Sequence, residues 1–345
     1  MKAEQAQNFG SVQVAAAVTL IIFLFGVAIR LTKPVLFPFL LAVMLSFILA
    51  PLIDLLTRLK VPKALSVLLI LILTFVALYL LGVLVFESGK SFASEVPKYG
   101  DRLRAEITAL AQKLHLSGLK GDPLQFLGRL DVNRLGSLFM SSIGPFLSFL
   151  SNLFLVLIFL IFILAGKGTV ETKIGKAFNP EQAARIRRIT VKINSEIQRY
   201  LVLKTISNLI MGIIAGIILW AFGVNFALLF AFMAFVLNYI PTIGSIIATL
   251  LPAAIAAIQF PTLWPAVWIL ILMTVAQNIM GNFVEPKIIG HGLGLSPLVV
   301  LFALFFWGWL WGIAGMVLAI PIAAMLRIVC ENIPSLRSIA VMMSH

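Results

Sequence analysis

The sequence has little of what catalytic and metal sites are made from. It contains one cysteine, Cys330, and three histidines that lie far apart along the chain. A single cysteine excludes an intrachain disulfide and a thiolate metal cluster. Charged residues make up only 11% of the chain, about half the share found in a typical globular domain. These shortages give no reason to expect a metal or another cofactor.

Charge is missing altogether from two long stretches in the second half of the chain. No Asp, Glu, Lys, Arg or His occurs from Thr205 to Val284, or from Gly292 to Leu326. Paired carboxylates and Ser–His arrangements therefore cannot form within these stretches. The chain also lacks the GxxxxGK[ST] loop that binds the phosphates of ATP. Neither an enzyme nor a directly ATP-driven pump is indicated.

Apolar residues, in contrast, make up 61% of the chain and gather in long runs. A helix that spans a bilayer core ~30 Å thick needs such a run of apolar residues, whereas the strands of a membrane β-barrel alternate apolar and polar residues. The expected fold class is an all-α, polytopic membrane protein. Lys and Arg number 26 against 13 acidic residues and are spread over several loops. This excess indicates the positive-inside bias of membrane proteins rather than nucleic-acid binding.

The order of apolar and polar segments predicts six parts. The first three spans are expected at Ser11–Ile29, Val35–Ile53 and Ala64–Phe86. The parts are N-terminal transmembrane helices (1–86), an extracytoplasmic amphipathic insert (87–140), a fourth span (141–165), a cytoplasmic basic amphipathic helix (166–200), a core with two broken hairpins (201–330) and a cytoplasmic tail (331–345).

The two polar parts each carry the signs of an amphipathic helix. In the insert, Leu103, Ile107, Leu110 and Leu114 recur at helical spacing and form one apolar stripe. The basic segment opens at Asn179-Pro180-Glu181, which supplies a cap, a first-turn proline and an early acid. We expect this helix to lie on the anionic inner leaflet before it enters the next span.

The core contains two apolar units that are interrupted in the middle. Ala227–Ile258 is broken at residues 238–245, and Ser296–Ile328 is broken at residues 307–315. Each follows an expected crossing, Leu201–Ala221 or Pro265–Phe283. Broken segments at corresponding places in two halves predict the binding site of a transporter.

The two halves also resemble each other in sequence. Ile210-Met211-Gly212 recurs as Ile279-Met280-Gly281, and Pro252 has its counterpart in Pro321 at the same spacing. The bases place the N-terminus in the cytoplasm. If each broken unit enters and leaves on one face, the repeat is inverted and the two tips approach near the membrane midplane. Paired full crossings fit the charges equally well.

Polar groups and chain breaks in the core are the candidate site, because a polar group in lipid is costly unless it is paired. Uncharged donors and acceptors suit a neutral, polyhydroxylated solute; hydrogen bonding between helices is the alternative role. The candidates are Asn208, Asn238, Pro241, Thr242, Gly244, Ser245, Gln277, Asn278, Asn282, Gly308, Trp311, Gly312 and Gly315.

Two charged residues flank the uncharged stretch. Glu285 is next to Pro286 and close to Lys287, so a surface ion pair or a bend is expected, with ion coupling as the alternative. Lys204 is expected to extend its amine from the inner end of its span to water.

Three stretches resemble the autoinducer-2 exporter (AI-2E) family of bacterial permeases. They are Asn238-Tyr239-Ile240-Pro241-Thr242-Ile243-Gly244, Gln277 through Gly290 with its Glu285-Pro286-Lys287, and Leu295-Ser296-Pro297-Leu298-Val299-Val300 running on to Ile320-Pro321. The resemblance implies a secondary transporter in the bacterial inner membrane that exports a small polar solute, with the quorum-sensing signal autoinducer-2 as the eponymous substrate. It also implies a homo-oligomer such as a pentamer and elevator-like movement. The cytoplasmic position of both termini is predicted from the bases, since Arg327 and Arg337 fall on the same side as the N-terminus.

Other members of that family are thought to exchange sodium for protons, so an antiporter is the first alternative. Members often carry a Glu where this chain has Met280, which removes one candidate for ion coupling. A structural scaffold that binds partners through the insert is the alternative of another class, but it gives the broken repeat no purpose.

Overall fold

The computed structural model describes residues 30–113, 153–166, 169–289 and 294–344, with a few positions between 20 and 28. These residues form helices, apart from connecting turns and one isolated bridge between Leu295 and Ser344. Five of the described helices are long and apolar enough to cross a membrane. The predicted all-α, polytopic membrane fold is confirmed.

The chain divides into two compact units. The first takes in the described parts of residues 1–46, 158–197 and 293–345, and the second those of residues 47–157 and 198–292. Each unit therefore contains one of the two broken segments.

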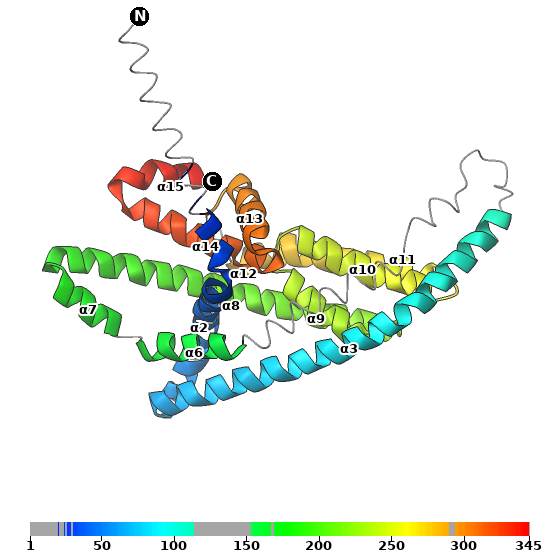
Figure 1. The fold of residues 1–345 in the computed structure, drawn as a ribbon, viewed down its shortest axis with the longest axis horizontal. Helices are drawn as coiled ribbons and strands as arrows, with labels where there is room; N and C mark the ends of the chain where they lie inside the picture. The colour runs from blue at the N-terminus through cyan, green and yellow to red at the C-terminus, as the bar shows by residue number, and fades with distance from the viewer. Residues whose placement is uncertain are drawn as a thin grey trace, which may run out of the picture. The chain divides into compact units, whose positions relative to one another are not determined.

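Three helices account for the predicted second, third and fourth spans. They are α2 (Lys33–Arg58), α3 (Lys63–Lys113) and α6 (Leu153–Gly166). Figure 1 shows α3 as one long helix, which continues past Phe86 to include the first part of the expected insert. The predicted span Ser11–Ile29 lies almost wholly outside the described residues, as does the rest of the insert from Leu114 on.

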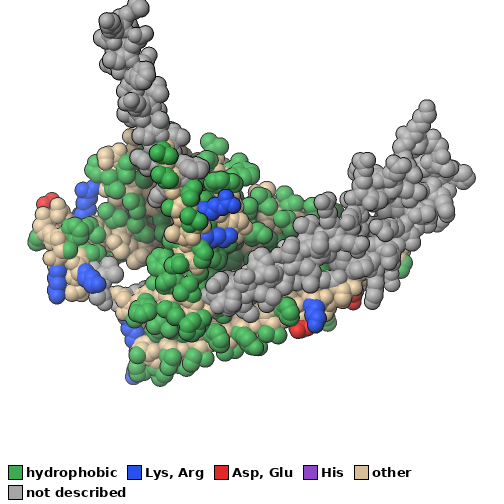
Figure 2. All heavy atoms as spheres, viewed as in Figure 1, with side chains coloured by type: hydrophobic (Ala, Val, Ile, Leu, Met, Phe, Trp, Pro, Cys, Tyr) green, Lys and Arg blue, Asp and Glu red, His purple; other side chains and the backbone are tan. Residues whose placement is uncertain are grey.

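Large apolar side chains lie on the outside of helices throughout the described chain. Trp220 is 79% exposed, Phe154 72% and Phe302 70%. Figure 2 shows hydrophobic side chains over most of the described surface in that view, with Lys and Arg in small groups. In water such a surface would be unfavourable, whereas against lipid tails it carries no penalty.

The basic segment forms α7 (Thr169–Ala177) and the first half of α8 (Pro180–Ala221). The predicted start of α8 is confirmed: the Gln182 amide donates to Asn179 Oδ1 at 2.9 Å, and Pro180 opens the helix. The helix then continues into the apolar crossing without interruption.

The first broken unit is a pair of helices, α9 (Ala227–Leu237) and α10 (Ile243–Gln259), which pack against each other. Its base is closed by Gln259, whose Nε2 donates to the Gly223 carbonyl and whose Oε1 accepts from the Asn225 amide, both at 2.8 Å. At 11 and 17 residues the arms extend about 16 and 26 Å, less than the ~30 Å of a bilayer core. These lengths favour a re-entrant hairpin over two full crossings.

The second broken unit comprises α13 (Pro297–Trp311) and α14 (Ile313–Asn332), which also pack together. Ser296 caps α13 by accepting from the Val299 amide at 3.4 Å, and Pro297 follows at the first helical position. The chain reverses at Gly312, where φ is +71°. After α14 come the short 3₁₀ helix η3 (Pro334–Leu336) and α15 (Arg337–Met343).

The two broken units share one construction at the break. In each, a residue with positive φ, Thr242 or Gly312, directly precedes the second arm. In each, an early glycine of that arm lies against a backbone carbonyl from the end of the first arm: Gly244 against Leu237, and Gly315 against Trp307. A Cβ at either glycine would overlap that carbonyl oxygen. The internal similarity seen in the sequence is therefore also a similarity of local structure.

Candidate functional site

The first break is built from residues that end one helix and distort the chain before the next. Pro241 has no amide hydrogen to continue α9, and Thr242 adopts φ +62°, a region that β-branched residues rarely enter. Such a conformation costs about 1–3 kcal/mol and persists only where surrounding contacts impose it. Gly244 provides the contact here, because it lets α10 approach the Leu237 carbonyl. The break is thus a defined feature of the fold.

A second irregularity follows α11 (Trp264–Ile279). The chain widens into a π-helix, η2 (Met280–Val284), before α12 (Glu285–Ile289). Pro286 gives the physical reason, since it lacks the amide hydrogen that would bond the Asn282 carbonyl in an α-helix and its ring would clash there. The Glu285 amide instead reaches back to the Met280 carbonyl. Single π turns of this kind are frequent at functional sites.

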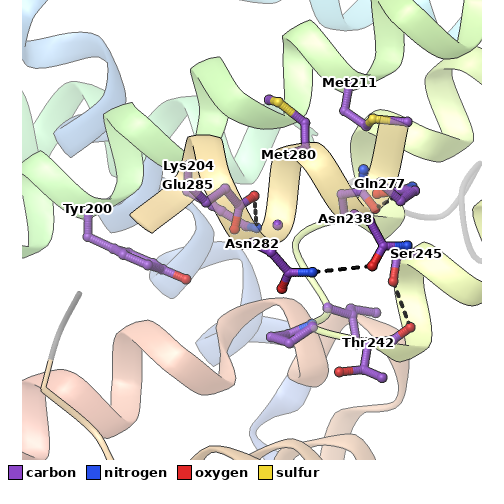
Figure 3. Close-up of a pocket in the computed structure, with 14 residues that line it drawn as sticks. Tyr200, Lys204, Met211, Asn238, Thr242, Ser245, Gln277, Met280, Asn282 and Glu285 are labelled. Atoms are coloured by element: carbon purple, nitrogen blue, oxygen red, sulfur yellow. Dashed lines mark hydrogen bonds and ion pairs between the residues drawn. The ribbon is translucent and has the colours of Figure 1, made fainter. Parts of the chain in front are cut away.

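A cavity of about 450 Å³ lies in the second unit between these two irregularities and α8. Figure 3 shows side chains from α8, the first break and η2 turned toward this space. The cavity is lined by Tyr200, Lys204, Met211, Asn238, Ile240, Pro241, Thr242, Ser245, Gln277, Asn278, Met280, Gly281, Asn282 and Glu285.

Uncharged hydrogen-bonding groups dominate the polar part of the lining. Gln277 Nε2 donates to Asn238 Oδ1 at 3.2 Å, and Asn282 Nδ2 donates to Asn278 Oδ1 at the same distance. These contacts hold four amides in position and leave further donors and acceptors for a ligand. Asn238 is buried, whereas Asn278 and Asn282 are exposed, so the cavity has a closed side and an open one.

One ion pair lies in the cavity wall. Lys204 Nζ donates to Glu285 Oε1 at 2.7 Å, and Ser207 Oγ donates to the same oxygen at 3.0 Å. The lysine side chain is 9% exposed and the glutamate 25%. Of the described residues in the lining, only Lys204 and Glu285 are charged, so these residues carry no net charge when both are ionised.

This pair corrects two expectations from the sequence. Lys204 was expected to reach water, but its amine is buried against a carboxylate 81 residues further along the chain. For Glu285 the sequence predicts a surface ion pair or a bend: the ion pair is with Lys204 in the cavity wall and not at the surface, whereas the irregular helix η2 ends directly before Glu285. The sequence gives no sign of this contact, because it depends on how α8 packs beside α12.

Eight of the predicted site residues line this single cavity: Asn238, Pro241, Thr242, Ser245, Gln277, Asn278, Asn282 and Glu285. Gly244 does not line it but shapes the break beside it. Asn208 is buried at 1% exposure, and neither its Oδ1 nor its Nδ2 has a hydrogen-bond partner among the described residues.

The four candidates from the second break belong to the other compact unit. Gly312 supplies the positive φ of the turn, Gly315 lies against the first arm, and Gly308 meets the Met316 side chain. Trp311 is buried and lies against Trp307 with ring centroids 4.8 Å apart. Within their own unit these residues define the tip of the second hairpin.

Sequence reasoning missed part of the lining. Met211 lies in the part of α8 that is predicted as a plain crossing, and Tyr200 ends the part that is predicted as the basic amphipathic helix. Met280 and Gly281 belong to η2. The spacing of Lys204 and Met211 places both on one helix face and could have drawn attention to it. Met280 forms an apolar wall at 5% exposure, at the position where the resemblance led us to expect a Glu.

A smaller cavity of about 300 Å³ adjoins the first. It shares Ser245, Gln277 and Asn278 with it and is otherwise lined by α10 and α11, including Thr249 and Thr274. Among the residues that the structure describes, no group of three or more His, Cys, Asp and Glu side chains is placed to hold a metal ion.

Comparison with known proteins identifies the family. The sequence model of the AI-2E family transporters matches residues 17–335. The AI-2 transport protein TqsA of Escherichia coli (strain K12) is 32% identical over 327 residues, which cover 94% of this chain and 93% of that protein.

Two further relatives, from Borreliella burgdorferi and Haemophilus influenzae, are provisionally named transport proteins. They are 33% and 31% identical, over 93% and 91% of this chain and 88% and 91% of their own length respectively. With its apolar helices and its two broken hairpins, the chain belongs to the AI-2E transporter family.

Proposed function

We propose that this protein is a secondary transporter that exports a small, neutral, polar solute resembling autoinducer-2 across the bacterial inner membrane. The observation that carries the proposal is the cavity at the first break. Its lining offers amides and hydroxyls from α8, the first break, α10, α11 and η2, and its two charges neutralise each other. The volume of about 450 Å³ lies within the usual range for small-molecule sites.

The chemistry of the lining favours a polyhydroxylated molecule over an ion or a lipid. Amide side chains both donate and accept, as hydroxyl groups do, so each can match several orientations of a polyol. Met211 and Met280 provide an apolar wall for a carbon skeleton. The name of TqsA supports autoinducer-2 as the first compound to test.

The transport step that we propose is alternating access with elevator-like movement of the hairpin-bearing part. In this proposal the two hairpins form an inverted repeat, the protein assembles as a homo-oligomer, and both termini face the cytoplasm. The shared construction of the two breaks supports a paired role for the hairpins.

Sodium/proton antiport is the second candidate, because Glu285 lies in the cavity wall. An antiporter needs a carboxylate that alternately binds the two ions. Here Lys204 already contacts that carboxylate at 2.7 Å. A neutral solute therefore remains the better match.

Uptake into inverted membrane vesicles that contain the protein tests the proposal, since inversion converts export into accumulation. Radiolabelled autoinducer-2 should accumulate saturably in these vesicles and not in vesicles without the protein. An Asn238→Leu variant should lose uptake, whereas Ser338→Ala, at an exposed position on α15 outside the cavity, should retain it. Absence of uptake by the folded protein, with sodium-dependent proton flux in its place, would overturn the proposal in favour of the antiporter.

A further inference from the structure

The ion pair in the cavity has a feature that neutral-solute binding does not require. Among the described residues, only one oxygen of the Glu285 carboxylate is bound: Oε1 accepts from both Lys204 Nζ and Ser207 Oγ. Within the described part of the chain, Oε2 has no donor. A carboxylate that is only 25% exposed is costly in a membrane-spanning segment unless a positive charge accompanies it.

The positive charge is a compact one. A lysine ammonium is a point charge with three donors, closer in form to a bound monovalent cation than the planar guanidinium of arginine. Its stem emerges from α8, and its head donates to Glu285 Oε1, the oxygen that also accepts from Ser207 Oγ. Carboxylate, hydroxyl and amide oxygens are the ligands that hard cations take in proteins.

α8 carries a further buried oxygen that the described residues leave unpaired. Asn208 lies one helical turn after Lys204, so the two side chains share a face of α8. Its amide is 1% exposed, and neither its oxygen nor its nitrogen has a partner in the described structure. A buried amide without partners is unfavourable by about 1–3 kcal/mol and therefore calls for a ligand.

We propose that the Lys204 ammonium occupies a cation position at Glu285, as a cation tethered to the protein. The carboxylate then needs no ion from solution, and solute movement is independent of sodium at this site. Removing the ammonium exposes a site for a monovalent cation formed by Glu285 and Ser207, with Asn208 as a further oxygen ligand. The consequence for coupling rests on the proposed transport function; the cation site itself does not.

Thermal unfolding of the purified, full-length protein in detergent tests the cation site without any solute. Lys204→Met should be stabilised by NaCl relative to choline chloride at constant ionic strength, because an ion that binds only the folded state raises the unfolding temperature in proportion to its occupancy. The rise should saturate with concentration and reach a few degrees. Wild type should show no such difference.

Three controls sharpen the test. Lys204→Met combined with Glu285→Gln should lose the sodium response, since the carboxylate is gone. Lys287→Met, which removes an exposed lysine outside the cavity lining, should behave as wild type. The charge exchange Lys204→Glu with Glu285→Lys should also show no response, because a tethered ammonium is again present.

The proposal is overturned if folded Lys204→Met responds to neither Na⁺, Li⁺ nor K⁺, or if wild type responds as strongly. Lys204→Gln is the second variant, because it keeps a hydrogen bond to the carboxylate without the charge. Failure of both variants to fold in any of the three salts also counts against the proposal, which requires a cation to replace the ammonium. In vesicles, wild-type uptake should not depend on sodium, whereas Lys204→Met uptake should.

Discussion

Gly244 gives the sharpest test of how the first break is built. In most helices a Gly→Ala change is favourable by about 1 kcal/mol, because glycine loses more backbone freedom on folding. At Gly244 the added Cβ would overlap the Leu237 carbonyl, a backbone atom that cannot turn aside. The first arm must therefore shift away from α10.

The change in stability is the difference between the cost of this overlap and the gain in helix propensity. Overpacking of this kind costs about 1–3 kcal/mol or more, which exceeds the gain in helix propensity. We expect Gly244→Ala to lower stability by about 2 kcal/mol, measured as the unfolding temperature of the purified protein, and to reduce solute uptake because Asn238 and Thr242 move with the break. Gly315→Ala should act in the same way through the Trp307 carbonyl.

Gly175 on α7 is the matched control. It is a helical glycine at which an added Cβ would meet, among the described residues, nothing within 4 Å beyond its chain neighbours and its own helix backbone. Gly175→Ala should leave uptake unchanged and stability equal or slightly higher. The reasoning would be refuted if Gly244→Ala were as stable and as active as Gly175→Ala.

Three further changes test other parts of the account. Glu285→Gln should lower the free energy of unfolding by about 2–3 kcal/mol, because it leaves the buried Lys204 ammonium without its partner. The loss stays below the roughly 3–5 kcal/mol of a fully buried broken pair, since a quarter of the glutamate is exposed. Chemical unfolding should show a smaller loss when Lys204→Met is added, because no unpaired charge then remains. Asn208→Leu should raise the unfolding temperature, since it removes a buried amide without partners; a lower temperature would mean that the amide is satisfied in the folded protein. Pro286→Ala should restore an amide donor to the Asn282 carbonyl and favour an α-helix over η2. The KM for solute should then rise, because Met280 and Asn282 turn to other directions. An unchanged KM would mean that the π turn has no role in solute binding.

Much of the helix pattern could be predicted from the sequence because lipid imposes simple rules. Runs of apolar residues gave α2 and the start of α3, and the cap at Asn179 gave the start of α8. The two breaks were also predictable, since Pro241 and Gly312 interrupt otherwise uniform apolar segments. Local chemistry determines each of these features.

Contacts between distant segments could not be predicted in the same way. The Lys204–Glu285 pair joins residues 81 positions apart, and either residue alone reads as an ordinary charge at the end of a span. The π-helix at Met280–Val284 depends on a proline two residues beyond its end and on packing around it. These contacts decide which polar residues face the cavity and which, like Asn208, are enclosed in the helix packing.

Protection of a cysteine in the cavity tests the central claim most directly, namely that the cavity at the first break binds the transported solute. With the single native cysteine replaced (Cys330→Ser), Ser245→Cys places one thiol in the cavity wall, and Ser338→Cys places one on the exposed face of α15 as a control. Saturating autoinducer-2 should slow maleimide labelling of Ser245→Cys in membranes and leave Ser338→Cys unaffected. Unchanged labelling of Ser245→Cys by a solute that the same vesicles accumulate would contradict the account and place the transport site elsewhere.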